Sequence, residues 1–444
     1  MKKKESLDML HGALSGKLIL FAIPIAVSSM LQQLFNAADT AVVGHFATSD
    51  ALAAVGTNGE IIALIVTLSA GLSMGVNVLI ARLIGEGRTK EITDVVHTAF
   101  TLALLLGFGG FLLGFLLSSP ILVAIHTPDS VLPLAVRYLR LYFAGYPFLL
   151  LYDFGSAILR AQGDSRTPFL ALALSGVINV LLNLFFVIVC ALGVAGVAIA
   201  TGLSTAVSAF LVLSRIGAVR LRFQRKYLRS ILAIGIPAAI QGAVFCFANI
   251  FVQASVNSLG MLATAGSTIA MNFEYFGYYM ITAFGQTATT FTSQNYAAGL
   301  KKRCKTVFFL CVLFSVLFSA LITVPLTVFR VEASGLFSGD PAVIENACTR
   351  IMLILILEPI CSFYEIPSGV LRGMGHSALP AALTVIGTCL FRVIWIFTVF
   401  AQYKTQESLF VSFPLSWVLT ILLTGVGFAV LCRRSARREQ PLHK

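Results

Sequence analysis

Charged residues are scarce in this 444-residue sequence. They make up 11% of the chain, whereas a soluble domain carries roughly 25%. Hydrophobic residues make up 58%, and the mean hydropathy is +0.91. A chain this apolar does not stay dissolved in water, and it is too poor in charge to be disordered. The composition therefore excludes a cytosolic enzyme, a secreted disulfide scaffold and a nucleic-acid-binding domain, despite the formal net charge of +12.

The residue sets of common catalytic and metal sites are also missing. The eight cysteines form no CxxC pair, and the six histidines lie at span ends and in loops without a ligand pattern. Residues 12–18 superficially resemble a phosphate-binding loop, but the spacing of their glycines is one residue too short and Leu18 stands where Ser or Thr is needed. These absences disfavour a metalloenzyme, an ATP-driven pump and an intramembrane enzyme, and no cofactor is expected.

Long apolar stretches, in contrast, are abundant. A membrane-spanning helix needs about 20 mainly apolar residues, and twelve such stretches follow one another with short connections. The first begins after Lys2, Lys3 and Lys4 but offers no small-residue cleavage site, so we interpret it as a retained span. The predicted spans are 17–43, 51–81, 94–119, 133–160, 166–189, 193–215, 229–257, 263–296, 305–330, 346–372, 379–401 and 409–431.

Basic residues indicate the orientation of these spans. Most of the 31 Lys and Arg residues fall on the side that carries both termini, and one, Arg392, falls inside a span. Because Lys and Arg concentrate on the cytoplasmic side, both termini of this multi-pass protein are predicted to be cytoplasmic, in the plasma (cytoplasmic) membrane. The opposite side receives Arg137, Arg140, Arg330, Arg350 and Lys404.

The two halves of the sequence resemble each other. Residues 152–163 align with 364–375, where a tyrosine, an acid, a serine, a Leu-Arg pair and a glycine recur in step, and Pro24 aligns with Pro237. Six spans per half insert with the same orientation, so the repeats are parallel and a substrate site is expected between them.

The predicted fold class is therefore an all-α integral membrane protein with twelve transmembrane helices in two parallel six-helix repeats. Its lobes are 12–220 and 221–434. Two such lobes are typical of an alternating-access transporter.

Several short segments carry a resemblance to a known family. They are Ala-Ile-Pro at 22–24, Gln-Gln-Leu-Phe-Asn-Ala-Ala-Asp-Thr at 32–40, Gly-Leu-Ser-Met-Gly at 71–75, Ile-Leu-Arg-Ala-Gln-Gly-Asp at 158–164 and Thr-Ser-Gln-Asn at 292–295. Over essentially its whole length the chain resembles the multidrug and toxic compound extrusion (MATE) transporters, bacterial branch. The resemblance implies two lobes that open as a V and export of mostly cationic amphiphiles in exchange for protons or sodium ions.

Asp39 is the main candidate for binding the coupling ion. A charge inside a span is costly, so a buried acid needs a reason. Gln32, Asn36 and Asp39 are spaced i, i+4 and i+7 and share one helix face, and Gln33 lies beside them. We interpret this face as a polar stripe turned away from lipid.

Asp39 has no counterpart in the second half, where Val252 takes its place, so its role is confined to the first lobe. Asn179 and Asn183, four residues apart in the fifth span, share a face and offer amide oxygens. An acid among neutral oxygens suits either a proton or Na⁺. In the resembled family an aspartate at this motif position carries the coupling cation, and the asparagines of the fifth span join it. A structural hydrogen bond between helices is the alternative.

Two acids, Asp153 and Glu365, occupy equivalent positions in the repeats. Each lies seven residues before an arginine, Arg160 or Arg372. Seven residues are two helical turns, so acid and arginine share a face but are expected to be too far apart for direct contact. Because the pairs are duplicated at cytoplasmic span ends, a gate or structural role is favoured over substrate binding.

Polar residues of the later spans are candidates for the substrate cavity. Glu274 lies near Tyr275 and Tyr278, and an acid beside aromatic rings suits an organic cation; packing against another helix is the alternative. Arg392 should have an acid partner. The other cavity candidates are Gln32, Gln33, Gln241, Asn249 and Gln253, with Glu60 and Glu358 as weaker ones.

Prolines and glycines mark places where helices bend or approach closely. Pro24 and Pro237 lie early in spans one and seven, and each permits a kink. We expect ion binding at Asp39 to change the bend or packing of the first span. Gly71 and Gly75 form a GxxxG spacing that allows two helices to pack closely.

These observations predict a secondary-active antiporter. It would export amphiphilic, cationic small molecules in exchange for H⁺ or Na⁺, as a monomer in the lipid bilayer and without a nucleic-acid partner. A lipid or oligosaccharide flippase of the same superfamily is the alternative. A major-facilitator carrier is disfavoured because the loop after the second span lacks its basic motif, and a channel or sensor remains a further option.

Overall fold

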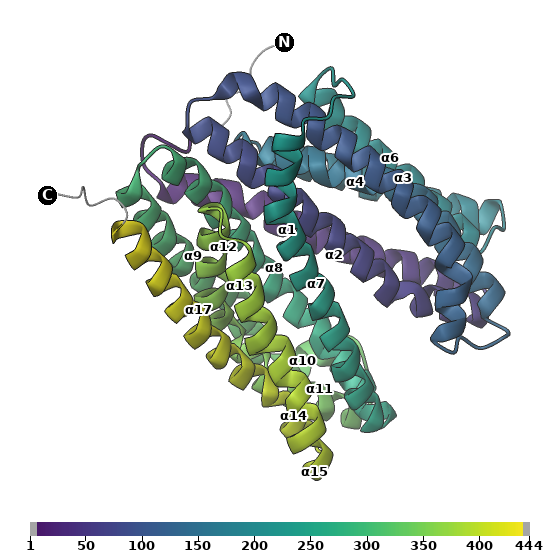
Figure 1. Ribbon diagram of the computed structural model, residues 1–444. Helices are drawn as coiled ribbons and strands as arrows, with labels where there is room; N and C mark the ends of the chain where they lie inside the picture. The colour runs from purple at the N-terminus through teal and green to yellow at the C-terminus, as the bar shows by residue number, and fades with distance from the viewer. Residues whose placement is uncertain (1–6, 438–444) are drawn as a thin grey trace, which may run out of the picture. The chain divides into compact units, whose positions relative to one another are not determined.

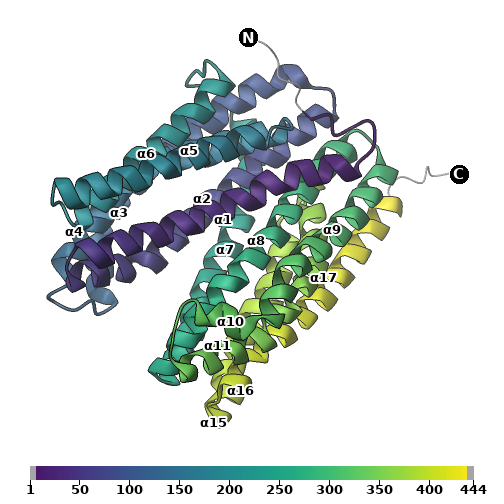
Figure 2. The same cartoon turned by 180° about the vertical axis from the view of Figure 1, so that it is seen from behind.

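The computed structural model describes residues 7–437, and in that range the chain is helical and contains no strand (Figures 1 and 2). Ten helical segments are long and apolar enough to cross a membrane. With α4 (30 residues) and α8 (37 residues) they account for all twelve predicted spans. Five of the basic residues that were used to predict the orientation lie outside the described residues. They are Lys2, Lys3, Lys4, Arg438 and Lys444.

The first seven spans are single rods or nearly so. Their bounds differ from the predicted ones by a few residues at most, because apolar runs end where the sequence becomes polar or charged. They are α1 (Ser15–Phe46), α2 (Ser49–Gly85), α3 (Ile92–Ala124), α4 (Leu132–Ala161), α5 (Arg166–Leu184, extended by a π-helical turn to Val189), α6 (Val194–Ile216) and α7 (Arg225–Ser258).

The later spans include interrupted ones. The tenth span narrows to a 3₁₀ turn at Leu355–Cys361, which contains Pro359, a residue that cannot donate a helical hydrogen bond. The remaining helices are α8 (Met261–Ala297), α9 (Lys301–Val328), α10 (Arg330–Gly335), α11 (Pro341–Leu353), α12 (Ser362–Gly373), α13 (Ala378–Thr384), α14 (Phe391–Trp395), α15 (Ala401–Tyr403), α16 (Gln406–Phe410) and α17 (Ser412–Arg437).

Two compact units make up the chain, and two helices contribute to both. The first unit holds Val27–Ala239 and the segment up to Asp8, and the second holds Met9–Ala26 and the chain from Ile240 onward. Helix α1 therefore passes from the second unit to the first just after Pro24, and α7 passes from the first to the second just after Pro237. The two prolines thus lie at equivalent transitions in the repeats.

Within the first unit, α3, α4 and α6 lie side by side, as Figure 1 shows, and α2 packs on α4. The beginning of α7 packs against α2 through glycines. A Cβ atom on Gly235 would lie 2.7 Å from the carbonyl oxygen of Leu72, and one on Gly75 would meet the carbonyl of Ile231. A Cβ atom on Gly71 would collide with the backbone of Ala239. The close helix approach predicted from the GxxxG spacing is therefore confirmed.

In the second unit, α8 is the central helix. It packs against α9, α11 and α12, and α12 packs against α17. The beginning of α1 belongs to this unit, where the rings of Phe21 and Phe291 meet edge-on with centroids 5.5 Å apart. Both units carry large apolar side chains on their exposed surfaces, among them Leu112, Leu116, Phe210, Leu317 and Leu321. Such surfaces are stable against lipid tails and would aggregate in water.

Candidate functional site

Asp39 lies in the first unit and is only 8% exposed. Two other helices hold its carboxylate. Asn183 of α5 donates a hydrogen bond from Nδ2 to Oδ1 of Asp39, and Thr201 of α6 donates from Oγ1 to Oδ2 at 3.3 Å. The aspartate of α1 is therefore bound from both oxygens inside the helix bundle.

Asn179 completes this cluster. Its Nδ2 donates to Oγ1 of Thr201 at 3.4 Å, and its Oδ1 accepts a hydrogen bond from Nδ2 of Asn183 at 3.3 Å. The structure thus brings together three residues that the sequence singled out, Asp39, Asn179 and Asn183. Thr201 was not among the predicted residues.

The cluster offers oxygen atoms to a small cation. Oδ1 of Asn183 is buried and has no hydrogen-bond partner, although buried polar atoms in proteins are normally satisfied. With the Asp39 carboxylate and the Thr201 hydroxyl it forms a set of hard oxygen donors, the type of ligand that alkali and alkaline-earth cations prefer. The carboxylate alone can also accept a proton. The arrangement fits H⁺ and Na⁺, and it lacks the nitrogen and sulfur ligands of a transition-metal site.

The remaining polar residues of α1 lie outside this cluster. Gln32 and Asn36 are exposed, and Gln33 is half-buried. Within the described residues no hydrogen bond joins the Asn36 side chain to Asp39; the backbone oxygen of Asn36 instead accepts from Thr40 at 3.0 Å.

In the second unit, Glu274 forms a buried ion pair with Arg350. The guanidinium donates to both carboxylate oxygens, from Nε at 2.7 Å and from Nη2 at 2.8 Å. It also donates to Ser267 at 2.5 Å and lies over the ring of Phe410. This bidentate geometry neutralises the acid within the helix bundle.

Arg350, which the sequence assigns to the outer side of the membrane, is buried within the helix bundle. The residue is 3% exposed. Helix α11 begins at Pro341, so Arg350 lies more than two turns after the beginning of this helix, and it contacts Glu274 and Ser267 of α8. The sequence predicted the side of the membrane on which this basic residue lies but not its buried partner, Glu274.

The prediction that Arg392 has an acid partner is wrong. Within the described residues no carboxylate pairs with it. Its Nε donates to Oγ of Ser416 at 3.0 Å, and its guanidinium lies 3.9 Å from the ring centroid of Phe413. A cation–π contact and a hydroxyl therefore take the place of the ion pair.

The pair Glu365–Arg372 makes the direct contact that was not expected. Nη1 of Arg372 lies 3.3 Å from Oε1 of Glu365, and Nη2 donates to Gln241 at 3.4 Å. Two helical turns rise about 10.8 Å, and the two long side chains bridge this rise by lying along the helix. In the other repeat, Asp153 accepts a hydrogen bond from Ser69 at 2.5 Å, and Arg160 is half-buried in the last turn of α4.

The other predicted cavity residues are spread over α7 and α8. Tyr275 stacks on Tyr279 with ring centroids 5.9 Å apart, Tyr278 is half-buried, and Gln253 donates to Asn257 at 2.9 Å.

Asn249 and Glu60 are exposed, whereas Glu358 is buried. One oxygen of Glu358 has no hydrogen-bond partner. It lies against Gly277 of α8, where a Cβ atom would collide with it.

The sequence profile of the MatE family matches the chain twice, over residues 24–185 and 237–398. The chain belongs to the MatE family. The two matched segments are of equal length and repeat the same region, which confirms the internal duplication. A member of this transporter family is a multi-pass membrane protein that moves small molecules, in agreement with the helical spans.

Relatives of this MatE protein cover most of its length. The probable multidrug resistance protein YoeA of Bacillus subtilis is 27% identical and covers 91% of each chain. The FAD transporter of Shewanella oneidensis is 27% identical and covers 76% of this chain and 78% of its own. A multidrug resistance MATE family transporter solved in an outward-facing conformation has the same fold, with a TM-score of 0.89 at 22% identity over 99% of this chain and 100% of that chain.

Proposed function

We propose that this MatE protein is a secondary-active antiporter that exports amphiphilic, cationic small molecules in exchange for H⁺ or Na⁺, and that Asp39 binds the coupling ion. The observation that carries this proposal is the buried polar cluster of Asp39, Asn179, Asn183 and Thr201, in which Oδ1 of Asn183 lacks a partner. The basic loops support the orientation with both termini in the cytoplasm of the plasma membrane.

Binding of an ion would remove an electrostatic penalty at this cluster. No arginine or lysine is paired with Asp39 in the described part of the chain, and its two hydrogen bonds come from neutral groups. An ionised, unpaired carboxylate inside a membrane protein is costly. A bound proton or Na⁺ neutralises it, so the occupied and empty sites favour different packing around α1.

Helix α1 offers a direct route from this site to the rest of the transporter. Its first part belongs to the second unit, and the part that carries Asp39 belongs to the first. Pro24 lies just before the transition. A change in packing around Asp39 would therefore alter the bend of a helix shared by both units, which couples ion binding to their movement.

Aromatic side chains of the second unit are consistent with a cationic, amphiphilic substrate. Tyr275 and Tyr279 present stacked rings on one face of α8, and aromatic faces attract an organic cation. Glu358 is buried against Gly277 on the opposite face of α8. Glu274 is already neutralised by Arg350, so we expect it to be structural.

The energetics permit this exchange. Maintaining a hundredfold gradient costs about 2.8 kcal/mol, and one charge that crosses about 150 mV releases roughly 3.4 kcal/mol. One ion can therefore drive a hundredfold gradient of a neutral substrate, whereas a monovalent cation needs an additional ion or a chemical ion gradient.

Dye transport in proteoliposomes tests the proposal. A pH gradient and a Na⁺ gradient are imposed separately, and the uptake of a cationic dye and of FAD is followed. We expect one of the two gradients to drive the cationic dye in the wild type and in Asp50→Asn, a change at an exposed residue, but not in Asp39→Asn. Gradient-driven transport by Asp39→Asn at the wild-type level would refute the ion-site assignment, and exclusive transport of FAD would refute the cationic substrate.

A further inference from the structure

A basic and apolar segment follows α6 in the first unit and leads to α7. Residues 217–224 are non-helical and lie along the first turns of α3. The backbone N–H of Arg220 donates to Nδ1 of His97 at 3.2 Å, Thr101 donates to the carbonyl of Arg222 at 3.1 Å, and the N–H of Gln224 donates to Thr98 at 3.3 Å. These hydrogen bonds hold the backbone of the segment against α3. They do not involve its side chains.

The arginines of this segment are free to bind an anion. Arg220, Arg222 and Arg225 are exposed, and no acidic residue within the described range forms an ion pair with any of them. Three unpaired guanidinium groups within six residues form a strong cationic patch, which we call the linker patch.

The acids at the neighbouring α2–α3 turn are already engaged. Glu86 pairs with Arg82 and Arg88 at 2.7 Å, and Glu91 pairs with Arg88 at 2.7 Å and with Lys226 at 3.5 Å. Partial burial raises the pKa of the Glu86 carboxyl, but hydrogen bonds from Arg82 and Arg88 outweigh it and hold that pKa below its usual range. These two acids are therefore already paired with Arg82, Arg88 and Lys226 and form no ion pair with the linker patch.

Apolar side chains accompany the arginines. Leu221 is 69% exposed and Phe223 is 52% exposed. Immediately before them, Val219 lines a small apolar hollow with little free space inside it.

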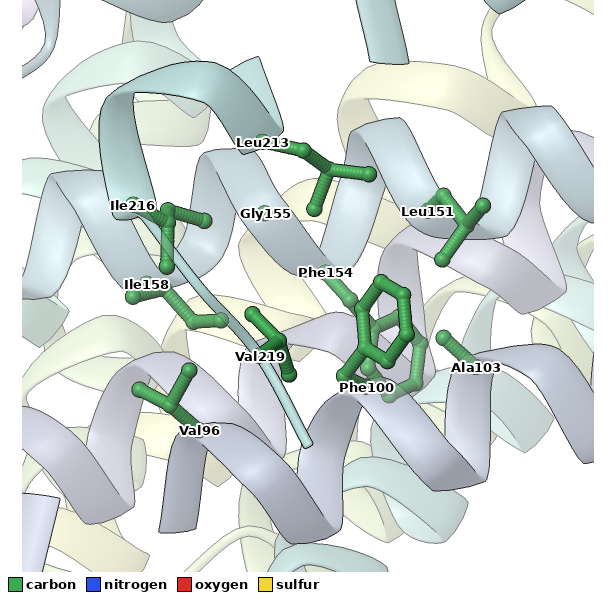
Figure 3. A pocket seen from close by; sticks show the side chains of 10 residues that line it. All are labelled: Val96, Phe100, Ala103, Leu151, Phe154, Gly155, Ile158, Leu213, Ile216 and Val219. Carbon is green, nitrogen blue, oxygen red and sulfur yellow. The ribbon is translucent and has the colours of Figure 1, made fainter. Parts of the chain in front are cut away.

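Figure 3 shows this hollow surrounded by hydrocarbon side chains. Its walls come from α3, α4 and α6, and include Val96, Phe100, Leu151, Phe154 and Leu213. The segment from Val219 to Arg225 therefore combines three features. It carries the cationic linker patch and two exposed apolar side chains, and it borders a hollow lined by hydrocarbon.

We propose that the linker patch binds an anionic phospholipid, whose phosphate contacts Arg220, Arg222 and Arg225 and whose acyl chain packs on Leu221, Phe223 and the apolar rim of the hollow at Val219. Basic residues next to a membrane span attract anionic headgroups. A free phosphate would leave the apolar side chains exposed, and a lipid covers both. The segment joins the two repeats, so the bound lipid would hold the connection at the membrane surface. This proposal does not depend on the coupling ion or on the exported substrate.

Lipid titration of the purified full-length protein in detergent tests it, with bound lipids counted by native mass spectrometry. Dioleoylphosphatidylglycerol is compared with dioleoylphosphatidylcholine and with inorganic phosphate as a competitor. A basic residue near an anionic membrane contributes roughly fivefold in affinity. We therefore expect Arg220→Gln/Arg222→Gln to weaken phosphatidylglycerol binding on the order of 25-fold, and phosphatidylcholine to bind weakly to both proteins.

Lys302→Gln/Lys305→Gln is the matched control, because it removes the same charge from an exposed basic turn of the second unit. We expect it to retain wild-type binding. Val219→Asn places a polar group at the hollow and should weaken binding of the dioleoyl lipid; thermal unfolding of each variant confirms that it is folded. Equal loss in the lysine variant, no preference for phosphatidylglycerol, or displacement of the lipid by millimolar inorganic phosphate would each overturn the proposal.

Discussion

Asn183 on α5 donates a hydrogen bond to the carboxylate of Asp39 on α1, although 144 residues separate them in the chain. The other carboxylate oxygen is bound by Thr201 on α6. Asp39, which has no counterpart in the second repeat, is therefore held by hydrogen bonds from two other helices of the same unit. Such fixation is required of a site that has to select one small ion.

Asn183 and Asn36 should differ in their effect on ion coupling. Asn183→Leu removes the bond to Asp39 and the unpartnered Oδ1, so we expect a strong loss of ion-driven transport. Asn36→Leu changes an exposed side chain without a hydrogen bond to Asp39 and should be close to wild type. The measurement is the initial rate of gradient-driven dye uptake, normalised to protein content. Equal losses in the two variants would show that the whole face of α1, and not the cluster, determines coupling.

Thr201 should tune the affinity for the ion. Thr201→Val keeps the shape but removes a donor to Asp39 and an acceptor for Asn179. A hydrogen bond to a charged group contributes about 1.5–3 kcal/mol, so the half-saturating ion concentration should shift by roughly tenfold or more. Thr201→Ser should restore the wild-type value, and Thr205→Val, one turn away on α6, is the control. An unchanged ion dependence in Thr201→Val would remove this residue from the site.

The ion pair between Glu274 and Arg350 should be a stability element. Removal of one partner of a buried pair costs about 3–5 kcal/mol, because the other charge is left uncompensated. We expect Glu274→Gln and Arg350→Gln each to lower the thermal unfolding temperature in detergent markedly. The double variant should be more stable than either single variant. If Glu274→Gln unfolds like the wild type but no longer binds the dye, Glu274 is a substrate ligand instead.

Pro24 should set the rate of the transport cycle. Pro24→Ala restores a backbone donor near the place where α1 passes between the units, which should straighten and stiffen the helix. We expect a several-fold lower turnover with an unchanged half-saturating ion concentration. Pro120→Ala, inside α3 of the first unit, is the control for the loss of a proline in a span. Normal turnover in Pro24→Ala would exclude the bend as part of the mechanism.

Helical spans and the duplication could be predicted from the sequence because both depend on patterns along the chain. A run of apolar residues predicts a span wherever the helix packs, and α5 with its π-helical turn ends at Val189 as expected. The meeting of Asp39 with Asn179 and Asn183 could also be anticipated, since buried polar residues in spans need one another. The resemblance to MATE transporters pointed to the same residues.

Contacts between distant side chains could not be predicted in the same way. Thr201 was missed because threonine is common in apolar helices, where its hydroxyl bonds to the preceding turn, as Thr201 also does to Val197. The ion pair of Arg350 with Glu274 was missed because 76 residues separate the two and no spacing links them. The buried cation of Arg392 is stabilised by an aromatic ring and a hydroxyl group. The spacing of residues in the sequence does not predict such contacts.

Ion flux measured together with substrate flux tests the central claim most directly. Proteoliposomes are loaded with a cationic dye, no ion gradient is imposed, and the movement of H⁺ and of radioactive Na⁺ is recorded while the dye leaves. The wild type should move one of these ions in the opposite direction in proportion to the dye, and Asp39→Asn should show no dye-dependent ion movement. Dye-dependent ion movement of wild-type size in Asp39→Asn would contradict the assignment of Asp39 as the coupling site.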